Sequence, residues 1–119
     1  MIQGIILLAV MQTPTPLPTI EVKAPADIAA VKAVTDALGT LSQKVTACVG
    51  AGQPVEKCRC SYPKELTSLR SKHEDLIKQH PVLTDQLVSF QFVNNEGRNI
   101  SDTLDLRTLR RQLATLKCD

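Results

Sequence analysis

"KCRCSYPKELTSLRSKH", residues 57–73, places two cysteines one residue apart and then runs into an amphipathic segment. A bridge between Cys58 and Cys60 would hold their Cα and Cβ atoms at separations that disulfides do not adopt. The spacing therefore predicts that the two cysteines belong to different disulfides, whose other halves are Cys48 and Cys118. The residues leave open which member of the pair joins Cys48.

Two helices are predicted on either side of this pair. Downstream, apolar residues recur every three or four positions and predict a helix from about Pro63 to Gln79, which Pro81 ends. Upstream, residues 25–49 show the same period, with a proline suited to the first helical position and the breaker "GAGQP" at 50–54. The segment between the two helices is predicted to be a loop that holds Cys58 and Cys60. The apolar stripe of the upstream helix consists of Ile28, Val31, Val34, Leu38, Leu41, Val45 and Cys48.

The period changes after the second helix. In "QLVSFQFV", residues 86–93, apolar and polar residues alternate, which favours a half-buried strand. "NNEG" at 94–97 predicts a turn, residues 98–104 a returning strand, and the leucines from 106 onward a last helix. The expected fold is α+β, a small disulfide-stapled domain in the order helix–helix–β-hairpin–helix. The alternative is an all-α helical bundle in which residues 82–93 form a helix.

The N-terminal residues predict export. "IQGIILLAVM" is about ten residues long, too short to cross a bilayer as a helix but typical of the apolar part of a secretory signal. We interpret residues 1–11 as a signal-like or short membrane-associated segment, residues 12–24 as a Pro-rich tether, and residues 25–119 as a single small disulfide-stapled domain. No basic residue precedes the apolar run, so membrane association through an uncleaved residue 2–11 segment stays open. The expected location is extracytoplasmic, periplasmic or secreted.

Composition limits the core and the partners. The chain has no Trp, one Tyr and two Phe, so aliphatic side chains must supply nearly all the burial. Four cysteines in a short exported chain indicate a disulfide framework, which small cores often need. Fourteen basic against twelve acidic side chains leave a net charge of +2, and no aromatic platform accompanies the basic residues. We therefore expect no nucleic-acid binding.

The Cys-x-Cys pair also permits a chemical interpretation. Cys60 precedes a predicted helix N-terminus and follows Arg59, and both features lower the pKa of a thiol. A metal site would need His73 or His80 to join the thiolates, and that spacing matches no common zinc motif. No set of catalytic residues stands out, so we expect no enzymatic activity, no cofactor and no bound metal.

The sequence thus favours a small exported, non-enzymatic binding, inhibitory or structural module that acts through its surface on another protein. One alternative is a thiol-redox or metal-handling protein that uses Cys58 and Cys60. A second alternative is a carrier of an apolar ligand, in which the apolar stripes would line an enclosed cavity.

Overall fold

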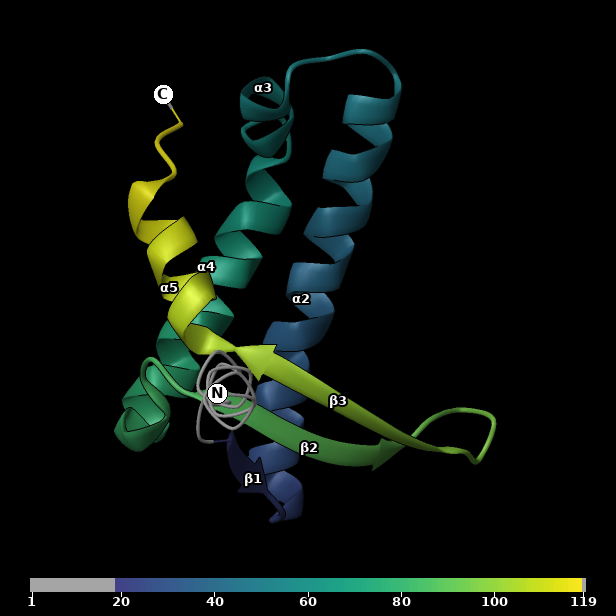
Figure 1. The fold of residues 1–119 in the computed structure, drawn as a ribbon, viewed down its shortest axis with the longest axis vertical. Coiled ribbons are helices and arrows are strands. Elements are labelled where there is room, and N and C mark those ends of the chain that lie inside the picture. Colours follow the sequence, from purple (N-terminus) through teal and green to yellow (C-terminus); the bar gives the residue numbers. More distant parts are fainter. Residues whose placement is uncertain (1–18, 119) are drawn as a thin grey trace, which may run out of the picture.

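The computed structural model describes residues 19–118, which form four helices and one three-stranded sheet. Figure 1 shows the sheet at one end of the molecule and the helices extending toward the opposite end. The α+β prediction is confirmed, including the hairpin, and the all-α alternative is wrong. In chain order the elements are β1 (Thr19–Val22), α2 (Pro25–Gly50), α3 (Val55–Arg59), α4 (Pro63–Gln79), a 3-10 turn (Pro81–Leu83), β2 (Leu87–Val93), β3 (Asn99–Asp105) and α5 (Leu106–Thr115).

The tether prediction for residues 12–24 needs correction at its C-terminal part. Residues 19–22 form β1, which pairs in parallel with β2, Ile20 opposite Val88 and Val22 opposite Phe90. Three of these four residues are β-branched and suit a strand. Their partner lies more than sixty positions away in the sequence, so the local pattern could not reveal the pairing. The domain therefore includes at least residues from Thr19 onward.

The predicted signal-like segment, residues 1–11, and the first part of the tether lie outside the described residues. Within residues 19–118, no helix is both long enough and apolar enough to span a membrane.

The sheet covers the first half of α2. β2 is the central strand, parallel to β1 and antiparallel to β3. Its inward side chains Val88 and Phe90 are at most 1 % exposed, and α2 contributes Val31 and Val34 to the same core, both fully buried. The hairpin turn is closed by the Asn94 side chain, which accepts hydrogen bonds from two backbone N–H groups. This part of the molecule, the sheet with the N-terminal half of α2, is called the sheet end.

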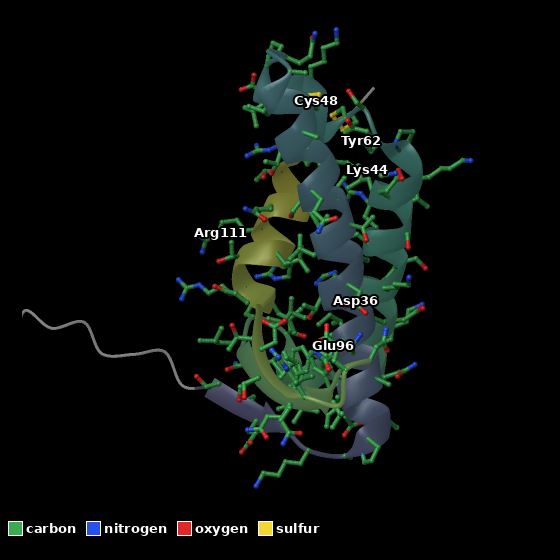
Figure 2. All side chains as sticks on the ribbon, turned by 90° about the vertical axis from the view of Figure 1, so that its right-hand side faces the viewer. Asp36, Lys44, Cys48, Tyr62, Glu96 and Arg111 are labelled. Atoms are coloured by element: carbon green, nitrogen blue, oxygen red, sulfur yellow. A yellow bond between two sulfur atoms is a disulfide. The ribbon has the colours of Figure 1, made fainter. Side chains whose placement is uncertain are left out.

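At the opposite end, burial along α2 stops. The buried residues of this 26-residue helix are Val31, Val34, Ala37 and Leu41, and residues 42–50 contain none. Here α2, α3, the start of α4 and the C-terminal residues meet around the four cysteines (Figures 1 and 2). This part is called the cysteine end.

The predicted loop between the two long helices contains a short helix. Residues 55–59 form α3, and Cys60 is its C-cap. The loop prediction was wrong because one helical turn is too short to show an apolar period. The turn nevertheless matters, since it directs Cys58 inward, where the side chain is fully buried, and leaves Cys60 to face the C-terminus.

Candidate functional site

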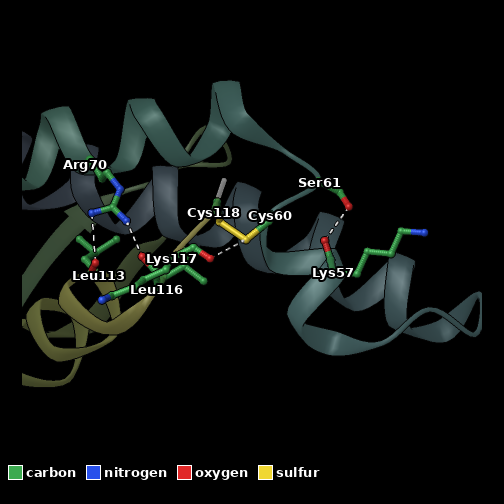
Figure 3. The surroundings of a disulfide bond; sticks show 8 residues. All are labelled: Lys57, Cys60, Ser61, Arg70, Leu113, Leu116, Lys117 and Cys118. Carbon is green, nitrogen blue, oxygen red and sulfur yellow. Dashed lines mark hydrogen bonds between the residues drawn. A yellow bond between two sulfur atoms is a disulfide. The ribbon is translucent and has the colours of Figure 1, made fainter.

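The cysteine end is closed by two disulfides. Cys48 is bonded to Cys58 and Cys60 to Cys118, with Cα–Cα separations of 5.7 and 5.4 Å. The Cys-x-Cys pair is thus divided between two bridges, in one of the two pairings that the sequence left open. The first bridge joins the end of α2 to α3, and the second joins the C-cap of α3 to the residues after α5 (Figure 3).

No cysteine is free within the described residues. Cys60 Sγ lies 3.7 Å from the carbonyl oxygen of Lys117 (Figure 3), but a disulfide sulfur carries no proton, so this is a contact and not a hydrogen bond. The two histidines lie along α4 away from the cysteines, and His80 pairs with Asp27 of α2 at 3.2 Å. In residues 19–118 no three His, Cys, Asp or Glu side chains are grouped as metal ligands would be.

An open groove of about 580 Å³ lies next to the cysteines, between α2 and α5. Figure 2 looks onto α2, with α4 on one side of it and α5 on the other. α2 packs along α4, while its other side faces the groove. The volume lies in the range of small-molecule binding sites.

α5, which forms one wall of the groove, is held at both of its ends. At its start, Asp105 caps the helix by accepting hydrogen bonds from the backbone N–H and the hydroxyl of Thr108. These bonds lower the pKa of the Asp105 carboxyl. At its end, the Arg70 guanidinium of α4 donates to the carbonyl oxygens of Leu113 and Leu116 at 3.1 and 3.4 Å (Figure 3), and the Cys60–Cys118 bridge follows.

The groove is lined mainly by aliphatic side chains, which come from α2, α3, α4 and α5. The contributing residues of α2 and α5 recur at spacings of three and four, so each helix presents one face. The floor comes from Leu66 and Leu69 of α4, which are 8 % and 1 % exposed. The apolar walls are Leu38, Leu41 and Val45 on α2 and Leu109, Leu113 and Leu116 on α5.

Charged side chains line the groove at one end only. Arg59 and Glu56 of α3 and Lys117 after α5 surround the cysteine end, and all three are exposed. The polar residues along the rim, Ser42, Thr46, Gln112 and Thr115, are uncharged. The groove is therefore apolar along its length and carries two cations and one anion at its end.

A second depression, of about 240 Å³, lies on the sheet and is lined by Glu21, Asp102 and mostly hydroxyl or amide side chains. It is below the usual volume of a ligand site, and Phe90 is the one apolar residue that the described part of the chain contributes to its lining. We therefore regard the groove as the stronger candidate.

Among the described residues, Nε2 of His73 is the one buried side-chain nitrogen or oxygen that has no hydrogen-bond partner. Burial, followed by the positive charge of Arg110, lowers the pKa of its ring, with an opposing effect of Glu74. Arg110 itself donates two hydrogen bonds to Asp85, which lowers the pKa of that carboxyl. His73 is a partly buried histidine, and no acid, base or nucleophile among residues 19–118 is paired with it.

Comparison with protein-family models, curated proteins and solved structures found no match. The function must therefore be argued from geometry. Sequence reasoning identified the four cysteines and named a carrier of an apolar ligand, with an enclosed cavity, as one alternative. It did not locate the open groove, because the lining residues look like ordinary core positions. The one signal available was the apolar stripe of α2, which continues past Leu41 to Val45.

Proposed function

We propose that this protein is an extracytoplasmic binding module, periplasmic or secreted, whose working surface is the groove between α2 and α5. The observation that supports this most directly is the groove itself, an apolar site of about 580 Å³ that the fold leaves open. The two disulfides, which are consistent with an extracytoplasmic location, flank it and fix the ends of its walls. Such a preformed site loses little conformational entropy when a ligand binds.

We propose binding and not catalysis, because the part of the lining that residues 19–118 contribute includes no histidine and no unbonded cysteine. Among the described lining residues Glu56 is the one carboxylate, and it is exposed, with no base or nucleophile of these residues paired with it as in a hydrolytic site. The aliphatic floor and walls instead suit recognition by burial of apolar surface.

The test uses an apolar fluorescent dye, anilinonaphthalene sulfonate, with the oxidised full-length chain. We expect saturable binding at one site. Gln112→Trp and Ser42→Trp place a large side chain at the rim of the groove and should abolish it, whereas Ala114→Trp and Gln43→Trp, exposed positions on the same helices outside the lining, should not. Circular dichroism establishes that each variant folds. Binding unaffected by the two groove variants, or no saturable binding, would refute the proposal.

A further inference from the structure

The groove has two chemically different ends. Toward the sheet end its α2 wall begins at Leu38, an aliphatic side chain, and no charged residue lines that part. Toward the cysteine end it terminates at Arg59, Lys117 and Glu56. A ligand that matches this pattern has an apolar body and one polar head, and the head lies beside the Cys60–Cys118 disulfide.

The sign of the head follows from the charges. Among the described residues, none of the three charged side chains forms an ion pair with another. The described residues that line this end of the groove are thus two cations and one carboxylate, with a net charge of +1. The planar guanidinium of Arg59 can bind both oxygens of a carboxylate, while Lys117 adds a point charge. An anionic head is therefore favoured over a neutral or cationic one.

The length of the groove sets the size of the apolar body. Leu38 and Thr46 are eight residues apart on α2, which corresponds to about 12 Å along the helix axis. An extended alkyl chain with C–C bonds of about 1.5 Å advances about 1.3 Å per carbon, so roughly ten carbons would span this wall. A single unbranched chain of this length suits a slot between two helices.

We propose that the groove binds a medium-to-long-chain fatty carboxylate, with the chain along Leu41, Val45 and Leu113 and the carboxylate at Arg59 and Lys117. This inference rests on the proposed function and adds the ligand class to it. It also names a role for the disulfides, since Cys60–Cys118 holds the two cationic positions on the same side of the groove.

The test measures displacement of the dye by single-chain amphiphiles below their micelle-forming concentrations. Dodecanoate, dodecanol and dodecyltrimethylammonium have the same chain and differ in the charge of the head. We expect dodecanoate to bind about fivefold more tightly than dodecanol, since the cations are exposed, and the cationic compound to bind most weakly. Shortening dodecanoate to octanoate should weaken binding by up to about fourfold for each methylene no longer buried.

Variants separate the head site from the groove. In Arg59→Gln/Lys117→Gln, dodecanoate should lose its advantage over dodecanol, while dodecanol binding is retained. Lys57→Gln is the matched control, because Lys57 is an exposed cation two residues from Arg59 and does not line the groove. A preference for dodecanoate that decreases with added salt in the wild type but not in the double variant would support the assignment further.

Different results would overturn different parts of the argument. Equal binding of all three amphiphiles, lost in Gln112→Trp, would refute the carboxylate assignment and leave the binding module in place. Binding to phosphatidylglycerol vesicles without binding to monomeric dodecanoate would replace a free fatty carboxylate by a lipid surface. Binding of none of these probes, the dye included, would refute both proposals.

Discussion

The sheet end and the cysteine end of this molecule are stabilised by different forces. At the sheet end, α2 buries Val31 and Val34 completely against Phe90 and its neighbours. At the cysteine end, residues 42–50 of the same helix have no buried side chain, and the Cys48–Cys58 bond ties the helix to α3. One helix thus passes from a region held by apolar burial into a region held by covalent bonds.

The difference between the two ends explains why the groove that we propose as a binding site lies at the cysteine end. A core that fills itself with side chains leaves no space for a ligand. Where disulfides hold the helix ends, the walls need not touch, and apolar surface stays accessible between them. The groove between α2 and α5 occupies the end where this second arrangement applies.

The largest effect is expected at the sheet end. Phe90 is 1 % exposed at the centre of the core, so Phe90→Ala should lower the free energy of unfolding by about 3 to 5 kcal/mol. Urea denaturation of the oxidised protein measures this loss. Gln91→Ala, an exposed position on the same strand, is the control and should change little. A loss near that of the control would mean that the aromatic core does not hold the sheet end.

Removing the long-range disulfide should have the next largest effect. Cys60 and Cys118 are 58 residues apart, so Cys60→Ala/Cys118→Ala should cost up to about 4 kcal/mol on the chain-entropy estimate. The Cys48–Cys58 bond closes a shorter loop, with a separation of 10, so Cys48→Ala/Cys58→Ala should cost about 3 kcal/mol on the same estimate.

Hydrogen exchange separates the two ends in these disulfide variants. Without Cys60–Cys118, amides of α5 should exchange faster while those of β2 stay protected, because the core at the sheet end is unchanged. Uniform loss of protection across both ends would show that they unfold as one unit and would contradict the comparison.

A smaller effect is expected at the junction where α5 leaves the sheet. Asp105→Ala removes the side chain that caps α5 and should cost about 1 kcal/mol, whereas Asp105→Asn should retain most of the cap. The pKa of Asp105 is lowered in the folded protein, so its stabilising contribution is complete above the unfolded pKa of about 3.8 and is lost as the pH falls through the folded value. Thermal unfolding of both variants at pH 7 and pH 3 measures this difference. Equal stability of Asp105→Ala and Asp105→Asn would show that the capping hydrogen bond of the Asp105 side chain does not stabilise α5.

The smallest effect concerns His73. Its pKa is lowered from 6.5 in the folded state, so the unfolded chain takes up the proton first as the pH falls. The contribution of His73 to the free energy of unfolding is therefore greatest above about pH 6.5, where the ring is neutral in both states. It falls as the pH drops from 6.5 to the folded pKa, and below the folded pKa it stays constant. His73→Leu removes both the titration and the unpartnered Nε2 atom, and the pH dependence of unfolding between pH 7 and pH 5 should flatten. An unchanged slope would assign that dependence to other groups.

Much of the fold was determined by the sequence. The spacing of apolar residues located α2 and α4 and their proline boundaries, and the switch to alternation located the β2–β3 hairpin. These predictions succeed because a helix or strand that buries one face repeats its apolar residues at its own period. That period is visible in neighbouring residues alone. The Cys-x-Cys spacing likewise directed Cys58 and Cys60 to different partners, because the geometry of a disulfide is local too.

Four features depended on tertiary structure. The sequence predicts a tether where β1 lies, because the partner strand of β1 is remote in sequence, and it predicts a loop where α3 lies, because one helical turn carries no period. The disulfide partners depended on α3. Its helical turn buries Cys58, which bonds to Cys48, and leaves Cys60 to face the C-terminal residues, where it bonds to Cys118. The groove depended on how α5 is held at its two ends, by Asp105 and by Arg70 with Cys118, at a distance from α2. A sequence records that a side chain is apolar, but only the packing of distant elements decides whether that surface is filled by the protein or left open for a ligand.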